Sequence, residues 1–438
     1  MKLKMIVAAI AATASASAFA AGSMNDQVQQ NASGTINVRT DAQYSQKMLN
    51  NQQVTGSALD ILNARKSGEL ASNAIYIGGK GEIYGTYGNQ SGNDNGNYKS
   101  APLVGGRSAD GIYTSNSNTN IKMPYADVAF TSTIGDWVTG FADLQVTDVG
   151  SSSVTLPKAY FIIGNLQKSP FYFVGGKKVV NFGKFDSVTN FMPTLTRAYF
   201  MAYGGQIAAG FSHNGVNATF TVMNGLGESM LNSQASSANQ VNDFAASASY
   251  NGMFDAINFY AGGGYINATG FSHNTNTGNN ASMVGAIDAN AGMDVHGVAV
   301  NGEFLMTTQG VKTMNDSSVY GNTIRSLSSV RDATGYKAFG FNALPAVIDF
   351  NSGATVKAWS LDSSYTMPVA GKDMVPYVSY SHVAQNSDNN IYQLEVGTRY
   401  NIIDTIWVGG SYNYMSGRSD AKTIGRFNTV MLDATAYF

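Results

Sequence analysis

A strict alternation of side chains runs along the last ten residues of the chain, 429–438. One set of alternate positions is entirely apolar and consists of Val430, Leu432, Ala434, Ala436 and Phe438. A period of two predicts a β-strand that presents one apolar face. The chain therefore ends on a predicted strand with an aromatic carboxy-terminal residue.

The same alternation recurs from residue 74 onward, in segments that are separated by turn residues. Sixteen segments fit a strand, near residues 74–87, 125–134, 138–147, 156–163, 171–179, 204–214, 216–222, 243–250, 257–265, 285–293, 297–307, 356–365, 374–383, 392–400, 405–414 and 427–438. Connections after even-numbered strands are short, whereas most connections after odd-numbered strands are long and polar, namely 88–124, 180–203, 223–242, 266–284 and 308–355. We predict an all-β fold, a transmembrane antiparallel β-barrel of about 16 strands over residues 73–438.

The beginning of the chain predicts export. Lys2 and Lys4 precede an apolar run over residues 5–12, and residues 18–20 (AFA) offer a small-x-small cleavage site. These features predict a secretory signal peptide over residues 1–20. The ending on Phe438 is similar to that of bacterial outer-membrane barrels, whose terminal Phe is read by the barrel assembly machinery. We therefore expect the protein in the cell outer membrane, in contact with its lipid and lipopolysaccharide, with both termini on the periplasmic side.

Residues 21–72 differ from the strand-rich part. Two short helical patterns lie near residues 41–50 and 58–70, and the second follows Ser57-x-x-Asp60, which predicts a capping box. We expect a short, partly helical periplasmic segment before the barrel. A poorly ordered tail is the alternative.

Composition supports a membrane barrel and excludes several other classes. Hydrophobic residues make up 44% of the chain and charged residues only 12%, about half the share that is usual in a soluble domain. Removal of the two lysines of the signal peptide leaves 24 basic and 28 acidic residues, a weakly acidic balance that argues against nucleic acid as a partner. The chain has no cysteine, so disulfides and thiolate metal sites are excluded. A secreted soluble all-β protein is the alternative.

Charged side chains recur at the strand positions that oppose the apolar face. A charge on the lipid face would cost roughly 2–4 kcal/mol, so these side chains are expected to face an aqueous lumen. The candidate pore-lining or ligand-contacting residues of the wall are Lys80, Glu82, Asp143, Lys158, Asp288, Glu303, Asp362, Glu395, Arg399 and Asp433. They either line a conduit or form a lattice of ion pairs that only stabilises the wall.

The loop over residues 180–203 is unusually apolar and aromatic for a solvated loop. It could fold into the lumen as a constriction and place Lys184, Asp186 and Arg197 near a passing solute. Alternatively, it packs on the rim or receives another envelope protein. The same choice applies to residues 308–355, which include the apolar stretch 339–350.

Sequence motifs of catalysis are not found. The chain has neither a Walker-type lysine motif, nor a Gly-x-Ser-x-Gly elbow, nor a His-Glu-x-x-His pair. Its four histidines are scattered, and the pentapeptide GFSHN at 210–214 and 270–274 falls at opposite ends of the predicted barrel. We expect no enzyme, no cofactor and no bound metal.

Five segments are AIYIGGKG (74–81), LPKAYFIIGN (156–165), SPFYFVGG (169–176), KKVVNFGKF (177–185) and AWSLDSSY (358–365). Together they resemble the LbtU-type siderophore porins and their iron-uptake relatives in the outer membrane. The resemblance implies a 16-strand barrel with a small periplasmic N-terminal element that takes part in the uptake of a ferric siderophore. It assigns no individual binding residue.

The predicted function is therefore a selective outer-membrane pore without a large plug, with a ferric siderophore as the small-molecule partner. A general or solute-specific diffusion porin is the first alternative. A barrel-anchored surface or adhesion protein is the second.

Overall fold

The computed structural model describes residues 37–50, 55–91, 117–123, 125–147, 153–189, 193–224, 241–269, 271, 283–311, 352–419 and 422–438. The predicted signal peptide (1–20) and nearly all of residues 308–355, including the apolar stretch 339–350, lie outside the described residues.

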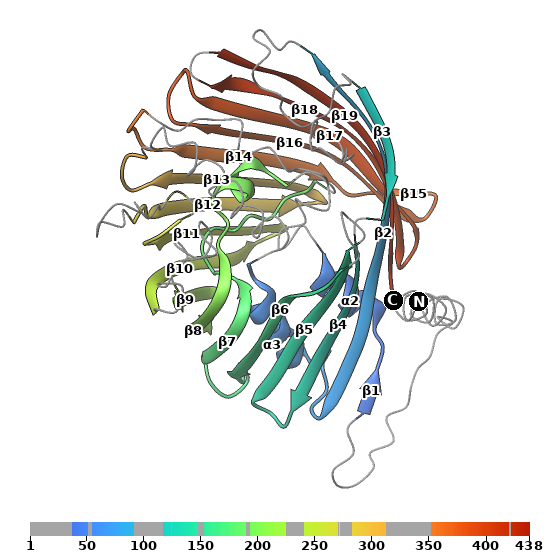
Figure 1. Ribbon diagram of the computed structural model, residues 1–438. Helices are drawn as coiled ribbons and strands as arrows, with labels where there is room; N and C mark the ends of the chain where they lie inside the picture. The colour runs from blue at the N-terminus through green and yellow to red at the C-terminus, as the bar shows by residue number, and fades with distance from the viewer. Residues whose placement is uncertain are drawn as a thin grey trace.

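Sixteen antiparallel strands form a closed barrel (Figure 1). They are β2 (Ala74–Ser91), β4 (Tyr125–Ile134), β5 (Val138–Thr147), β6 (Ser153–Gly164), β7 (Phe171–Val179), β8 (Tyr203–His213), β9 (Val216–Asn224), β10 (Val241–Phe254), β11 (Ile257–Ile266), β12 (Ala286–Val295), β13 (Val298–Thr307), β14 (Lys357–Tyr365), β16 (Lys372–Ala384), β17 (Asn390–Ile403), β18 (Ile406–Ser419) and β19 (Lys422–Tyr437). Each pairs with its neighbour in sequence, and β19 closes the ring against β2. All sixteen predicted strands are confirmed.

Two further short strands extend the wall. The strand β3 (Ser117–Lys122) continues the pairing of β4 along β2, and β15 (Met367–Val369) continues that of β14 along β16. A third, β1 (Asn37–Arg39), lies parallel to the first residues of β2. The described residues form the helices α2 (Ala42–Leu49), α3 (Ser57–Ser67) and α4 (Leu195–Phe200). No described helix has the length and hydropathy required for a membrane span.

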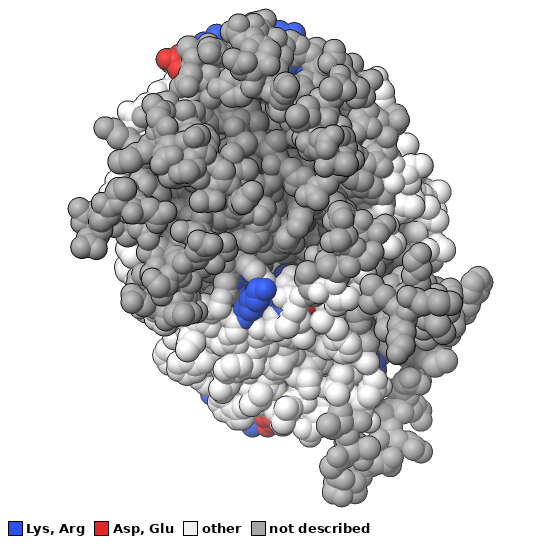
Figure 2. All heavy atoms as spheres, in the orientation of Figure 1, with Lys and Arg blue, Asp and Glu red and all other residues white. Residues whose placement is uncertain are grey.

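The two faces of the wall have the predicted chemistry. Large apolar side chains point outward and are exposed, among them Ile83, Leu144, Phe161, Phe173, Ile207, Phe220, Ile287, Phe304, Leu361, Val396 and Leu432. In Figure 2 the described surface over β4 to β8 carries few charged atoms. An exposed apolar surface of this extent is typical of a barrel whose outside contacts lipid.

Tight turns mark one end of the barrel. Asn214 and Gly215 join β8 to β9 with φ values of 49° and 80°, and His296 and Gly297 join β12 to β13 with 51° and 82°. Positive φ at both central residues is the type I′ pattern, which matches the right-handed twist of a hairpin. We call this end of the barrel the short-turn end.

The helices α2 and α3 lie inside the barrel, not in front of it (Figure 1). Both are buried against the inward-facing residues of β2 and β4 to β8. The predicted helices are thus confirmed, and the structure places them, at Ala42–Leu49 and Ser57–Ser67, against the inner wall of the barrel. The reason is that the inner wall on this side carries aromatic side chains, which the apolar helix faces cover.

The predicted capping box is wrong. The N-cap of α3 is Gly56, which provides no side-chain hydrogen bond, and the Ser57 hydroxyl instead accepts a hydrogen bond from Tyr160 Oη at 3.1 Å. The side-chain cap is on α2, where Asp41 Oδ1 accepts the N–H of Tyr44 at 2.9 Å.

Two adjacent glycines allow close contacts on both sides of the wall. A Cβ atom on Gly78 would lie 1.6 Å from Ser45 Oγ of α2, inside the barrel. A Cβ atom on Gly79 would lie 2.3 Å from the ring of Phe438, on the outside. The carboxy-terminal residue exchanges two backbone hydrogen bonds with Gly79, at 2.7 and 3.0 Å. Docking of α2 and closure by Phe438 both depend on this dipeptide.

Candidate functional site in the barrel lumen

The loop after β7 folds into the lumen. Val180, Phe182 and Phe185 are fully buried, and α4, which follows later in the same loop, packs on the inner side of β13, β14 and β16. The described residues of this segment, 180–189 and 193–202, thus reach from β7 to the opposite wall of the barrel, and we call them the constriction loop. Of the alternatives predicted for this loop, folding into the lumen is confirmed for the described residues.

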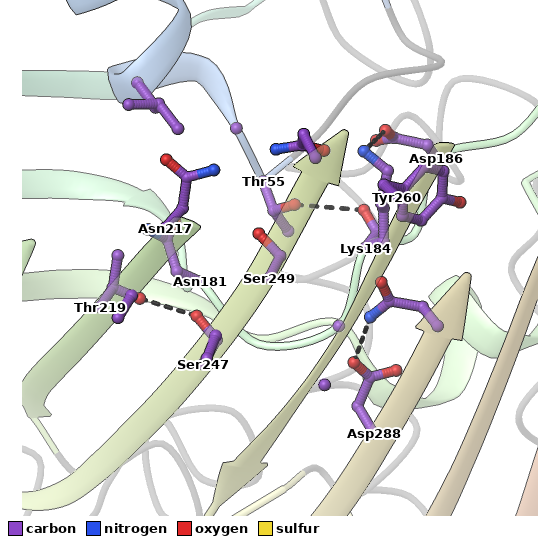
Figure 3. Close-up of a pocket in the computed structure, with 18 of the residues that line it drawn as sticks. Thr55, Asn181, Lys184, Asp186, Asn217, Thr219, Ser247, Ser249, Tyr260 and Asp288 are labelled. Atoms are coloured by element: carbon purple, nitrogen blue, oxygen red, sulfur yellow. Dashed lines mark hydrogen bonds and ion pairs between the residues drawn. The ribbon is translucent and has the colours of Figure 1, made fainter. Parts of the chain in front are cut away.

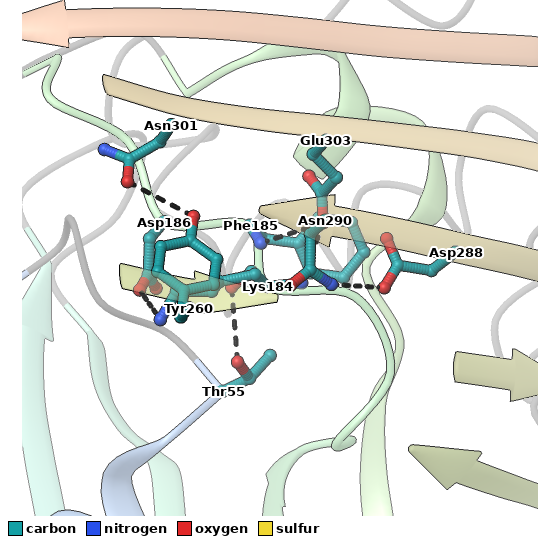
Figure 4. Close-up of polar contacts among 9 residues, drawn as sticks. All are labelled: Thr55, Lys184, Phe185, Asp186, Tyr260, Asp288, Asn290, Asn301 and Glu303. Carbon is teal, nitrogen blue, oxygen red and sulfur yellow. Dashed lines mark hydrogen bonds and ion pairs between the residues drawn. The ribbon is translucent and has the colours of Figure 1, made fainter. Parts of the chain in front are cut away.

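Polar side chains of the wall hold the constriction loop in place (Figure 4). Glu303 Oε1 on β13 accepts the backbone N–H groups of Lys184 and Phe185 at 2.7 and 3.1 Å. The backbone N–H of Leu195 donates to Ser381 Oγ on β16 at 3.0 Å. Phe185 has φ of 54°, a conformation that an L-residue adopts at a cost, and the bonds to Glu303 stabilise it.

All thirteen predicted site residues lie on the lumenal side, on the inner wall or on the constriction loop. They do not form one site. Lys80 is 1% exposed and lies 3.2 Å from Glu82 and 3.8 Å from Asp127, whose other oxygen accepts a hydrogen bond from Gln145. For Lys80 and Glu82 the structure therefore shows the lattice of ion pairs that was the alternative to a conduit.

Next to this lattice, Asp143 on β5 lies opposite Lys158 on β6 in the strand register. Arg399 lies over the ring of Trp407 at 5.0 Å from its centroid. Arg399 and Asp433 flank Gly409 on the two neighbouring strands. Arg197 is buried within α4.

An acidic group occupies the opposite wall. Asp288, Glu303, Asp362 and Glu395 point inward from β12, β13, β14 and β17, and all four are buried. Glu395 accepts hydrogen bonds from Tyr377 Oη at 2.9 Å and Asn413 Nδ2 at 3.3 Å. Side chains from distant parts of the sequence are thus brought to one side of the lumen.

A cavity of about 290 Å³ lies between α3, the constriction loop and the inner wall of β9 to β12 (Figure 3). It contains three predicted residues: Lys184, Asp186 and Asp288. Lys184 Nζ lies 2.9 Å from Asp186 Oδ2 and 4.5 Å from the centroid of the Tyr260 ring.

The remaining lining of the cavity was missed by sequence reasoning. Most of it is uncharged and polar, with Thr55, Asn63, Asn181, Asn217, Thr219, Ser247, Ser249, Asn251 and Asn290. The alternation of β9 and β10 already predicted that some of these point inward, but short neutral side chains give no signal of their own. Thr55 and Asp60 could not be placed, because only the tertiary structure brings α3 to this wall.

Asp60 is the titratable group that α3 contributes to the cavity. Burial raises the pKa of its carboxyl to about 6, and the charge of Asp186 acts in the same direction. Lys47 and Lys184 oppose this and lower the pKa of Asp60. The net charge of the cavity therefore changes with pH near 6.

No group of three or more potential metal ligands occurs among the described residues. His213 and His296 lie at the short-turn end, whereas His382 lies on β16 beside the ring of Trp359. The fourth histidine, His273, lies outside the described part of the chain.

Comparison with solved structures gives the barrel type. The outer membrane channel DcaP of Acinetobacter baumannii matches with a TM-score of 0.51 and 12% identity, over 83% of this chain and 97% of that one. OmpF of Salmonella typhi in complex with daunomycin matches with a TM-score of 0.51 and 11% identity, over 83% and 97%. OprB of Pseudomonas putida at high pH matches with a TM-score of 0.51 and 9% identity, over 83% of this chain and 94% of that one. The fold is that of a porin-type outer-membrane barrel.

Sequence comparison reaches only part of the chain. A family described as "Protein of unknown function (DUF3573)" matches residues 99–225. The UPF0422 protein of Coxiella burnetii (strain RSA 493 / Nine Mile phase I) is 30% identical over 122 residues, which are 27% of this chain and 26% of that protein. The match thus spans about a quarter of the length of that relative.

Proposed function

We propose that this protein is an outer-membrane channel that admits small polar solutes and favours cationic ones. The observation that carries the proposal is a lumenal cavity, bounded by a constriction loop, in a barrel whose inward charged side chains are mostly carboxylates. Export by the predicted signal peptide and assembly into the outer membrane are parts of the same proposal.

The charge balance of the lumen supports a preference for cations. On the described strands and the constriction loop, the inward carboxylates are Glu82, Asp127, Asp143, Asp186, Asp243, Asp288, Glu303, Asp362, Glu395 and Asp433, and the basic residues are Lys80, Lys158, Lys178, Lys184, Arg197 and Arg399. The excess of carboxylates lowers the electrostatic potential of the lumen and concentrates cations there. The preference follows from the whole wall, not from one residue.

The segments that occupy part of the lumen support a limit on solute size. The helices α2 and α3 cover one side of the inner wall, and the constriction loop crosses to the other side. A barrel of sixteen strands would otherwise leave a wide aqueous channel. The remaining space suits small solutes.

A ferric siderophore as the solute remains a prediction that rests on the resemblance to LbtU-type porins. The cavity of about 290 Å³ lies at the lower limit of pockets for drug-sized ligands, which supports a smaller solute. Uptake of labelled iron, supplied as ferric siderophore to a deletion strain and its complement, tests this prediction separately. Unchanged uptake under iron starvation would remove the siderophore from the proposal and leave the channel.

The channel itself is tested with the purified protein in a planar lipid bilayer under a gradient of KCl. We expect stepwise conductance and a reversal potential that shows a higher permeability for K⁺ than for Cl⁻. The double variant Asp362→Asn and Glu395→Gln removes two inward charges, so its permeability ratio should fall several-fold. The control is Asp404→Asn, which should leave the permeability ratio unchanged. Asp404 lies in the turn between β17 and β18 and forms an exposed ion pair with Lys372. Absence of conductance, or a preference for Cl⁻, would contradict the proposal.

A further inference from the structure

The cavity beneath the constriction loop already holds an ammonium group that belongs to the protein. The Lys184 ammonium lies between the carboxylate of Asp186 at 2.9 Å and the ring face of Tyr260 at 4.5 Å (Figure 4). A carboxylate together with an aromatic face is the arrangement by which proteins bind ligand cations. Lys184 is about one-third exposed, so this ammonium lies at the edge of the cavity and does not fill it.

A second carboxylate in the same cavity lacks a complete set of hydrogen-bond donors. Asp288 is only 7% exposed, and its Oδ2 accepts a hydrogen bond from Asn290 at 2.5 Å. Its Oδ1 accepts no hydrogen bond from an amide or hydroxyl donor within the described structure, and the neighbouring carboxyl group is that of Glu303. A buried carboxylate oxygen without a donor is unfavourable, and an ammonium group of a ligand would supply both a donor and a charge.

Short side chains of β9 and β10 form the other side of the cavity. Asn217, Thr219, Ser247 and Ser249 lie close together in Figure 3, and Thr219 Oγ1 and Ser247 Oγ share a hydrogen bond of 2.7 Å. Amide and hydroxyl groups both donate and accept, which is the chemistry that matches the hydroxyl groups of a sugar ring. The volume of about 290 Å³ lies at the lower limit of pockets for drug-sized ligands, which suits a single ring.

We propose that this cavity is a binding site for a small hydroxylated amine of the hexosamine class, with the ammonium group at Asp288 and the hydroxyl groups at β9 and β10. The inference deepens the proposed function, because it names a class of solute for the cation-preferring channel. Lys184 competes with the ligand, since its positive charge lines the same cavity.

The test is isothermal titration calorimetry of the detergent-solubilised full-length mature protein with glucosamine at pH 7.5. N-acetylglucosamine and glucose are the matched neutral ligands, because they retain the ring and its hydroxyl groups but lack the ammonium charge. We expect saturable binding of glucosamine and affinities at least about tenfold lower for both neutral sugars. Equal affinities for the three sugars, or no heat with glucosamine, would overturn the inference.

Three variants locate the binding. Asp288→Asn should weaken the binding of glucosamine at least about tenfold, whereas Asp433→Asn, which removes a lumenal carboxylate outside the cavity, should not. Lys184→Met removes the competing positive charge and should tighten binding several-fold, a gain that misfolding cannot produce. Unchanged affinity in both Asp288→Asn and Lys184→Met would place the ligand elsewhere and overturn the inference.

Binding in detergent does not depend on conduction, so the two proposals can fail separately. Cation-selective conductance without binding of glucosamine would overturn only the hexosamine site. Binding of glucosamine by a protein that conducts no ions would retain the site and overturn the channel.

Discussion

The two sides of the lumen are built by the same strand geometry and differ only in which side chains point inward. The side formed by β2 and β4 to β8 presents aromatic residues, including Tyr76, Phe141, Tyr160 and Tyr172, and the N-terminal helices cover it. The side formed by β9 to β14 presents hydroxyl, amide and carboxylate groups at the cavity, and it also presents apolar residues on which the constriction loop packs, including Met223, Ala245, Ile266, Leu305 and Ala358. The inward residues therefore decide what covers the inner wall, because aromatic surface is stabilised by burial under helices, whereas polar groups need hydrogen-bond partners from the loop or from water.

Removal of the helices should have the largest effect on this difference. Deletion of residues 37–72 would expose the aromatic side of the inner wall to water and remove the main filling of that side. We expect a several-fold increase in single-channel conductance, measured in planar bilayers. A truncation of residues 21–36 alone is the control and should leave the conductance unchanged. Equal conductance of both truncations would show that the helices do not restrict the pathway.

Release of the constriction loop should have the second largest effect. In Glu303→Ala, the N–H groups of Lys184 and Phe185 lose their acceptor, at a cost of roughly 1–3 kcal/mol for each group that stays buried and unpaired. We expect fluctuating conductance and faster swelling of proteoliposomes in larger sugars. Glu303→Gln keeps an acceptor oxygen and should behave more like the unmodified protein. Identical swelling rates for the two variants would argue against Glu303 as the anchor.

The third largest effect is expected for the change in the stability of α3 with pH. Burial raises the pKa of Asp60 to about 6, above an unfolded value of about 3.9. The folded state therefore binds this proton more tightly, and the free energy of unfolding of the segment should fall between about pH 4 and pH 6, by about 3 kcal/mol at most. Asp186, Lys47 and Lys184 act on the same carboxyl and are part of this response.

Hydrogen exchange of the α3 amides, corrected for the intrinsic rate, measures this effect. Protection should be higher at pH 4.5 than at pH 7.5, and Asp60→Asn should remove most of the difference. Equal protection at both pH values in the unmodified protein would show that Asp60 is not the responsible group.

The smallest effect is expected for the guanidinium that fastens α3 to the short-turn end. Arg65 donates to the carbonyl oxygens of Gly135 and Val138 at 2.6 and 3.1 Å and to Thr139 Oγ1 at 2.7 Å. Arg65→Lys keeps the charge but not the planar set of donors, so α3 should lose about 1 kcal/mol of protection from exchange. The exchange of β17 amides is the internal control and should not change. A general loss of protection throughout the barrel would instead indicate an effect on the whole fold.

Much of the barrel could be predicted from the sequence, and less of the candidate site. The inward positions of Asp288 and Glu303 follow from their place in an alternating strand, and the structure confirms them. The position of α3 inside the barrel does not follow from the sequence. An apolar helix face predicts that this face is buried, but it does not predict which residues it packs against. The partners of single charged residues do not follow from the sequence either. An inward position of Lys80 is compatible both with contact to water and with an ion pair to Glu82.

The sequence by itself thus determined the sixteen strands, the two faces of each strand and the end at which the tight turns lie. These features depend on side chains two residues apart and on turn residues with positive φ, which are local properties of the chain. The tertiary structure alone decided that α2 and α3 fill one side of the lumen, that the constriction loop crosses it and that Lys184, Asp186 and Asp288 share a cavity. These contacts join residues that are far apart in the sequence, so they depend on the shape and chemistry of the closed barrel interior, which no local pattern contains.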